Sequence, residues 1–178
     1  MHLEEKTIAS EQKFDGRIVK LFVDKAELEN GETVVREVIK HPGGVCVVAL
    51  DGEDNVLFVR QFRYPHQRVL LEIPAGKLEY GEDHRACGLR ELKEETGCTC
   101  DEFDYLGCLI PTPAYDSEII HMYLARGLHY GAQKLDEGEF LDVEKIPLEK
   151  AAEMIMNNEI GDAKTQLAIL KTKLLLGK

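Results

Sequence analysis

Three glutamates within residues 76–98 have the spacing that could bind a metal ion. Glu91, Glu94 and Glu95 stand at i, i+3 and i+4, so on a helix their carboxylates share one face. Like charges at this spacing repel one another, and the neighbouring Arg90 offsets that repulsion only in part. One interpretation is a solvated acidic surface. The other is a site for a hard cation, because clustered carboxylate oxygens suit magnesium or manganese.

The residues around these glutamates favour the cation site. Gly76 precedes the helix and Gly97 ends it, so the backbone can take conformations there that other residues avoid. The full series is Gly76, Glu82, Arg90, Glu91, Leu92, Glu94, Glu95, Gly97 and Cys98. It resembles the Nudix box: Gly, five residues, Glu, seven residues, then Arg-Glu-apolar-any-Glu-Glu-any-Gly-apolar. Agreement at every fixed position has a chance probability on the order of one in a hundred million for a given start.

The Nudix resemblance implies metal-assisted hydrolysis of a nucleoside diphosphate linked to another moiety, with Mg²⁺ as the cofactor and Mn²⁺ as the alternative. It implies that Glu91 and Glu95 are the principal metal ligands, with Glu94 beside them at the catalytic centre. Arg90 is expected to orient these carboxylates through charge-assisted hydrogen bonds and not to touch substrate.

Outside the box, several stretches resemble the ADP-ribose pyrophosphatase branch of this family, and the likeness covers nearly the whole chain. They are Arg36-Glu37-Val38 and residues 59–65, 71–76, 136–139 and 161–165. The branch implies that ADP-ribose is cleaved to AMP and ribose 5-phosphate. The same motifs fit hydrolases of GDP-mannose or another nucleoside diphosphate sugar. A non-catalytic Nudix module that senses ADP-ribose or a nucleotide is a further alternative, of another class.

The branch resemblance also implies residues that contact the small-molecule substrate. Arg36 and Arg63 fall where the branch has substrate-contacting arginines, which can pair with phosphate or stack on an adenine ring. Glu72 falls where a substrate- or metal-contacting glutamate occurs. The main-chain carbonyl of Ala75 falls where the branch supplies a metal ligand.

The general base is expected in the acidic stretch DEGEFLDV. Glu137 is the favoured residue for taking the proton from the attacking water, and Glu139 is expected to be a further metal ligand. Glu118 is a competing candidate within a substrate-contacting loop. The branch usually has Ser-Pro-Gly at the start of that loop, whereas this chain has Thr112-Pro113-Ala114, which leaves the shape of the loop open.

Composition limits the kinds of partner. The net charge of -11 argues against nonspecific nucleic-acid binding, which needs Lys and Arg to neutralise phosphates. No segment has the apolar character of a signal peptide or a membrane span, so no membrane partner is expected. The five cysteines are scattered, which predicts reduced thiols in a cytoplasmic protein.

The arrangement of elements predicts an α+β protein. Residues 1–41 are expected to form an N-terminal antiparallel β segment, with strands at 17–28 and 33–40 joined by an Asn30-Gly31 turn. Residues 42–178 are expected to form the Nudix domain, a mixed β-sheet sandwiched between helices. Its expected elements are strands at 45–50, 55–62, 103–110 and 118–125 and helices at 82–96, 148–158 and 162–176. In the branch, the leading segment usually helps to form a homodimer.

Overall fold

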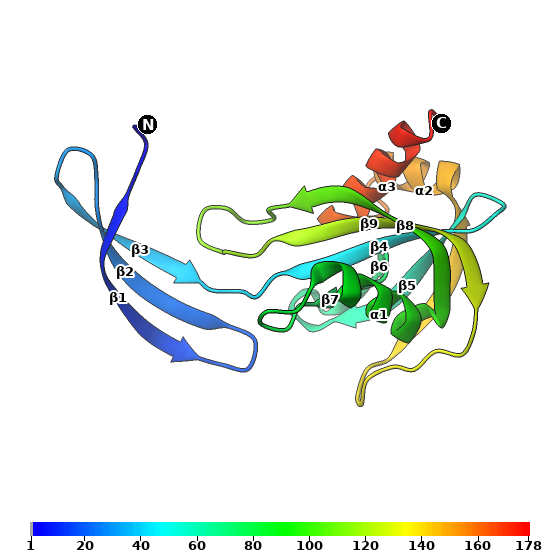
Figure 1. The fold of residues 1–178 in the computed structure, drawn as a ribbon, viewed down its shortest axis with the longest axis horizontal. Helices are drawn as coiled ribbons and strands as arrows, with labels where there is room; N and C mark the ends of the chain where they lie inside the picture. The colour runs from blue at the N-terminus through cyan, green and yellow to red at the C-terminus, as the bar shows by residue number, and fades with distance from the viewer. Residues whose placement is uncertain (1) are drawn as a thin grey trace. The chain divides into compact units, whose positions relative to one another are not determined.

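The structure, a computed structural model, describes residues 2–178 (Figure 1). In chain order its elements are β1 (Lys6–Asp15), β2 (Lys20–Glu27), β3 (Thr33–Ile39), β4 (Gly44–Leu50), β5 (Asn55–Arg63), the short 3-10 helix η1 (Tyr64–His66), β6 (Arg68–Glu72), β7 (Ala75–Lys77), α1 (His84–Thr96), β8 (Cys98–Leu109), β9 (Ile120–Tyr130), β10 (Leu141–Pro147), α2 (Leu148–Met156) and α3 (Ala163–Leu175).

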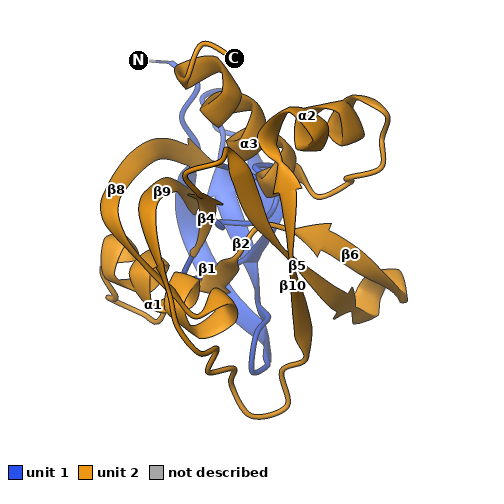
Figure 2. Cartoon of the chain, turned by 90° about the vertical axis from the view of Figure 1, so that its right-hand side faces the viewer, with its two compact units in different colours: residues 1–43, 110–119 blue, residues 44–109, 120–178 orange. Residues whose placement is uncertain are grey.

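The chain divides into two compact units (Figure 2). The first unit holds residues 1–43 and 110–119, and the second holds residues 44–109 and 120–178. The division after Gly43 lies close to the end of the N-terminal segment expected from the sequence. The functional assignment of residues 1–41 and 42–178 as separate domains stays a prediction.

The first unit is built on an antiparallel sheet in the order β1-β2-β3. The β2–β3 hairpin turns at Asn30-Gly31, where Gly31 has a φ of +82° and the Asn30 side chain accepts a hydrogen bond from the Glu32 amide at 3.0 Å. This is the turn that the Asn-Gly pair predicts. The 110–119 segment joins the end of β3 through hydrogen bonds from the Ile39 amide to the Tyr115 carbonyl and from the Ser117 amide to the Ile39 carbonyl.

The second unit contains a mixed sheet in the order β10-β5-β4-β9-β8, with β6 beside β5 and β7 beside β4. β4 and β9 run parallel, and the other pairs are antiparallel. The apolar run at 45–50 becomes the fully buried central strand β4. Strands β6, β7 and β10 lie in stretches where the sequence patterns had not indicated separate strands.

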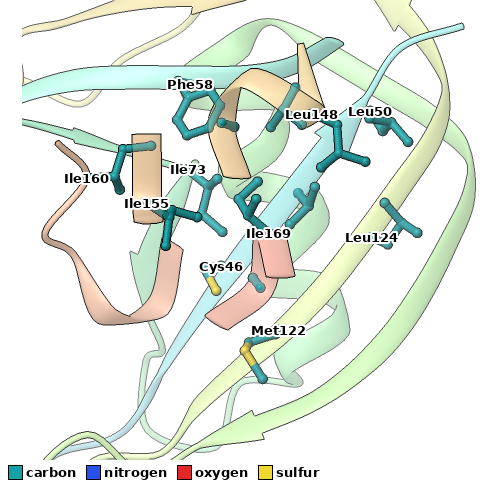
Figure 3. Close-up of a cluster of buried hydrophobic side chains, with 14 of the residues drawn as sticks. Cys46, Leu50, Phe58, Ile73, Met122, Leu124, Leu148, Ile155, Ile160 and Ile169 are labelled. Atoms are coloured by element: carbon teal, nitrogen blue, oxygen red, sulfur yellow. The ribbon is translucent and has the colours of Figure 1, made fainter. Parts of the chain in front are cut away.

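Alternating residues of β4 face two apolar clusters. Val45 and Val47 belong to the cluster that includes Cys87 and Leu92 of α1. Cys46, Val48 and Leu50 belong to the cluster with α2 and α3, part of which is drawn in Figure 3: Cys46, Leu50, Phe58, Ile73, Met122, Leu124, Leu148, Ile155, Ile160 and Ile169. Helices therefore cover both faces of the sheet, as Figure 1 also shows, and the expected mixed sheet between helices is confirmed.

Helix α1 begins later than the sequence pattern indicated. It starts at His84 because Asp83 keeps an extended backbone and its side chain accepts a hydrogen bond from the Ala86 amide at 2.9 Å, which leaves Glu82 outside the helix. It ends at Gly97, whose φ of +74° is the expected left-handed cap.

Helices α2 and α3 agree with the expected helices at 148–158 and 162–176, and Asp162 caps α3 by accepting from the Thr165 amide. Along residues 2–178, none of the helices combines the length and apolar character needed to span a bilayer.

Candidate active site

The guanidinium of Arg90 organises three carboxylates of the acidic segment, residues 76–98. Arg90 Nη1 donates to Glu91 Oε1 and to Glu94 Oε2, both at 2.8 Å. Its Nε and Nη2 donate to Glu82 Oε1, both at 3.3 Å. Because Glu82 precedes the helix and the other two lie on it, Arg90 ties the loop before α1 to the helix face. Through these hydrogen bonds Arg90 can orient the carboxylates of metal-ligand candidates.

Glu95 is buried against strand β7. The residue is only 3% exposed, and its Oε2 accepts a hydrogen bond from the Ala75 amide at 2.9 Å. The pKa of Glu95 is raised to about 8, chiefly by burial and in addition by the negative charges of Glu91 and Glu139, while the hydrogen bond from the Ala75 amide opposes the rise. A buried carboxylate beside other carboxylates is a group that a bound cation would stabilise.

Gly76 is needed at its position because the Glu91 side chain passes over it. A Cβ atom on Gly76 would overlap the carboxylate of Glu91. Burial also raises the pKa of Glu91, with the Arg90 guanidinium acting in the opposite direction. The first glycine of the box therefore gives the first metal-ligand candidate the space to reach strand β7.

A second ionic group lies at the junction of β5, β6 and α3. Arg63 Nε and Nη2 donate to the two oxygens of Glu72 at 2.7 and 2.8 Å. Lys164 donates to the same carboxylate and also pairs with Asp162 at 3.0 Å. Glu72 is 1% exposed, and although burial alone would raise its pKa, Arg63 and Lys164 hold it at about 2.

The Arg63–Glu72 pair uses Nε and Nη2 of the Arg63 guanidinium, and Nη1 takes no part in it. The Arg63 side chain is 37% exposed. The charge of Glu95 acts on the pKa of Arg63, so the second ionic group lies close to the acidic helix. Glu72 is thus engaged in holding Arg63, a residue predicted to contact substrate.

The loop between β9 and β10 brings a further carboxylate to this region. Glu139 accepts a hydrogen bond from Gln61 Nε2 at 3.2 Å, and its charge acts on both Glu91 and Glu95. Glu137 is exposed at the turn formed by the Glu139 amide and the Asp136 carbonyl. In residues 2–178 no hydrogen bond or ion pair fixes the Glu137 side chain, so its carboxylate is free to reorient.

Two predicted substrate residues belong to the first unit. Arg36 forms a bidentate pair with Glu5, with N···O distances of 2.9 and 2.7 Å. Glu118 lies 3.5 Å from His41 Nδ1. Their roles with substrate stay predictions. The structure brings the remaining predicted residues together in the second unit: Arg63, Glu72, Ala75, Arg90, Glu91, Glu94, Glu95 and Glu139, with Glu137 on the adjoining loop.

Sequence reasoning gave no role to Lys164 or Gln61. Lys164 lies in the 161–165 stretch noted for its resemblance, but a lysine at the start of a helix is ordinarily solvated, and its burial beside Glu72 depends on how α3 meets β6. Gln61 lies in an expected strand, and its partner Glu139 is distant in sequence.

The donor set fits a hard divalent cation, although the carboxylates are turned toward protein partners. Over residues 2–178 no three Asp, Glu, His or Cys side chains already converge in the manner that holds an ion. Arg90 engages Glu91 and Glu94, and the Ala75 amide engages Glu95. The pKa values of Glu91 and Glu95 are nevertheless raised, chiefly by burial and in addition by neighbouring carboxylates, so these partners do not fully stabilise the charged forms.

Comparison with known proteins identifies the family. A model of the NUDIX domain matches residues 40–166. The chain is 47% identical over 168 residues to the methanol dehydrogenase activator of Bacillus methanolicus, covering 93% of this chain and 91% of that protein. It is 45% identical over 169 residues to the ADP-ribose pyrophosphatase of Bacillus subtilis (strain 168), covering 94% and 91%.

A solved structure supports the fold. The crystal structure of an ADP compounds hydrolase superposes with a TM-score of 0.87 at 21% identity, covering 99% of this chain and 96% of that one. The family match spans the acidic segment, its two glycines and the strands that carry Arg63, Glu72 and Ala75. The chain therefore belongs to the Nudix family and is a Nudix hydrolase.

Proposed function

We propose that this protein is a magnesium-dependent pyrophosphatase that hydrolyses ADP-ribose to AMP and ribose 5-phosphate. The observation that carries the proposal is the convergence of half-buried Glu91 and buried Glu95 with the Arg63–Glu72 pair in one unit. The relative named ADP-ribose pyrophosphatase, 45% identical over 94% of the chain, supports the choice of substrate.

The metal would be held by the side chains of Glu91, Glu95 and Glu139 and by the Ala75 carbonyl. Nudix ADP-ribose pyrophosphatases generally depend on divalent metal ions, and Mg²⁺, with Mn²⁺ as a substitute, suits an all-oxygen donor set. When bound, such ions neutralise the pyrophosphate and lower the pKa of water.

The chain's own residues divide the remaining work. Arg90 keeps Glu91 and Glu94 in place through its hydrogen bonds, and Glu72 holds Arg63 with Nη1 outside the pair. Arg63 then contacts a phosphate or the adenine ring. Glu137 takes a proton from the attacking water, whose oxygen bonds to one phosphorus as the P–O–P bridge breaks.

A direct test is incubation of the purified protein with ADP-ribose or GDP-mannose, with Mg²⁺, Mn²⁺ or a chelator. We expect metal-dependent AMP release from ADP-ribose and a loss of several orders of magnitude in Glu95→Gln. Glu149→Gln is the matched control, because Glu149 pairs with Lys173 on the helices α2 and α3. GMP release from GDP-mannose with no AMP from ADP-ribose would refute the assignment of ADP-ribose as the substrate. Binding without turnover would favour the sensor alternative.

A second candidate function is activation of a dehydrogenase. The methanol dehydrogenase activator of Bacillus methanolicus is 47% identical over 93% of the chain, which is similar to the identity with the pyrophosphatase. Adding the protein to purified methanol dehydrogenase tests this role. A rise in dehydrogenase activity that disappears in Glu95→Gln supports it, and an unchanged rate rejects it.

We also propose that the β1-β2-β3 sheet joins two copies of the chain. Every residue of β1 is exposed, and Ile8, Phe14 and Val35 are 49%, 57% and 59% exposed. Apolar side chains gathered on a small sheet are typical of an interaction surface. Size-exclusion chromatography with light scattering should give twice the chain mass of 20.1 kDa, and a monomer mass contradicts the proposal.

A further inference from the structure

The segment that follows β9 is fastened to the last turn of the acidic helix α1. The Lys134 amide donates to the main-chain carbonyl of Glu94 at 3.0 Å. The side-chain amide of Gln133 donates to the main-chain carbonyl of Glu95. Carbonyls in the last turn of a helix have no partner within the helix, so this segment satisfies two groups that would otherwise need water.

Two glycines allow the segment to come this close. A Cβ on Gly97 would overlap the Gly131 carbonyl, and a Cβ on Gly131 would lie only 3.0 Å from the Gly97 carbonyl oxygen. Gly97 also has a φ of +74°, which disfavours other residues by itself. The last glycine of the box thus has a second function besides ending α1, because it admits the 131–134 segment.

The 131–134 segment is the first part of the loop between β9 and β10 that carries Glu137 and Glu139. Beyond Lys134 the chain runs to Glu137 and Glu139, and Glu139 is held at the other side by Gln61 at 3.2 Å. The loop is therefore tethered at both ends, whereas Glu137 between them is exposed.

We propose that Gln133 is a positioning residue, which with the Lys134 amide fixes the loop bearing Glu137 to the helix bearing Glu91 and Glu95. The inference rests on the proposed function, in which these residues act on one substrate. Glu91 and Glu95 lie on α1, whereas the proposed base Glu137 lies on the β9–β10 loop, and their relative placement must hold within a fraction of an ångström for proton transfer to be efficient. Hydrogen bonds to the main chain of Glu94 and Glu95 themselves couple the two elements directly.

The experiment compares four variants of the full chain: Gln133→Met, Lys134→Pro, Lys134→Met and Gln133→Lys. Gln133→Met keeps a similar length and removes the donor, and Lys134→Pro removes the amide donor. Lys134→Met is the matched control, because it changes the side chain and keeps the amide. Steady-state kinetics with ADP-ribose at saturating Mg²⁺, hydrogen exchange of residues 131–140 and thermal unfolding are measured for each.

We expect kcat of Gln133→Met to fall about three- to tenfold, the effect of losing one hydrogen bond, with KM within twofold of wild type. Exchange of the loop amides should rise in Gln133→Met and Lys134→Pro and stay unchanged in Lys134→Met. Gln133→Lys, which restores a donor, should recover part of kcat. A purely structural role would lower the unfolding midpoint without this split between kcat and KM.

The proposal is overturned if kcat of Gln133→Met and Lys134→Pro stays within twofold of Lys134→Met. It is also overturned if kcat falls while loop exchange is unchanged, or if Gln133→Lys recovers nothing. A wild-type protein that does not cleave ADP-ribose contradicts the proposed function instead. In that case hydrogen exchange of residues 131–140 alone tests whether Gln133 and the Lys134 amide hold the loop to α1. Unchanged exchange in both Gln133→Met and Lys134→Pro overturns this part of the proposal.

Discussion

The buried Glu72 carboxylate allows a quantitative test of the ionic group beside the candidate site. Glu72→Gln removes the charge shared by Arg63 and Lys164 and keeps the shape of the side chain. The pKa of Glu72 is held at about 2 against an ordinary value of 4.5. At about 1.4 kcal/mol per pKa unit, this difference corresponds to roughly 3 kcal/mol of stability at neutral pH.

A loss of that size is near the low end for breaking a buried ion pair, about 3–5 kcal/mol. Asp162 still pairs with Lys164, and Arg63 is partly exposed, which explains a value at the low end. For a chain of 178 residues, the thermal midpoint should fall by roughly 6–12 °C.

The pH dependence distinguishes this explanation from a packing defect. Because the folded-state pKa of Glu72 is lowered, its contribution is complete above about pH 5 and is lost as the pH falls toward 2. At pH 3 about 2 kcal/mol has already gone, so wild type and Glu72→Gln should differ by only about 1 kcal/mol there. Urea unfolding at pH 7, 5 and 3 measures this difference.

Glu144→Gln is the control, because Glu144 makes the same bidentate contact with Arg60, at 2.8 and 2.9 Å, on an exposed surface. Its loss should cost less than about 1 kcal/mol. A difference between wild type and Glu72→Gln that stays constant from pH 7 to pH 3 would refute the assignment of the stability to the charge.

Three substitutions in the acidic segment give further expected outcomes. Gly76→Ala should displace the Glu91 carboxylate and lower kcat on ADP-ribose at least about a hundredfold, measured by AMP release, with a far-ultraviolet circular dichroism spectrum like wild type. Arg90→Met should weaken Mg²⁺ activation about 10- to 100-fold, read from a metal titration of the rate, and an unchanged titration contradicts the orienting role. Glu95→Gln should raise the unfolding midpoint of the metal-free protein, because Glu95 is buried beside Glu91 and Glu139, and should abolish the stabilisation that Mg²⁺ gives wild type.

The sequence predicted those parts of the fold that depend on local patterns. Buried β4 follows from its apolar run, the β2–β3 turn from Asn30-Gly31, and the start of α3 from Asp162. Helix α1 was expected to begin at Glu82 but begins two residues later, at His84, because Asp83 is its N-cap. Strands β6, β7 and β10 were missed because each depends on pairing with β4 or β5 more than on its own pattern.

The candidate site was predictable where one element carries it. Glu91, Glu94 and Glu95 share α1, so their common face follows from helical spacing alone. The partners that hold them come from elsewhere. The Ala75 amide on β7 and Gln61 on β5 reach the site through sheet pairing, and no spacing rule connects them with α1.

Lys164 illustrates the same limit in the ionic group. Asp162 caps α3 and pairs with Lys164, while Thr165 Oγ1 accepts a hydrogen bond from the Ile73 amide at 3.0 Å. The start of α3 is therefore fastened to the strand end that carries Glu72. A lysine that would be solvated on an isolated helix becomes the second cation of a buried carboxylate only because of this junction.

The two glycines that enclose the acidic segment connect these observations. Gly76 lies where the Glu91 carboxylate crosses strand β7, and Gly97 lies where the 131–134 segment crosses the end of α1. At each glycine a second element thus comes close to the helix. The number of residues between each glycine and the glutamates therefore reflects these packing contacts as well as the geometry of the turns. The spacing of the motif therefore encodes where the metal ligands meet β7 and where the loop with Glu137 begins. For this reason a pattern read on one segment can predict a site whose remaining groups come from β5, β6, β7, α3 and the loop between β9 and β10.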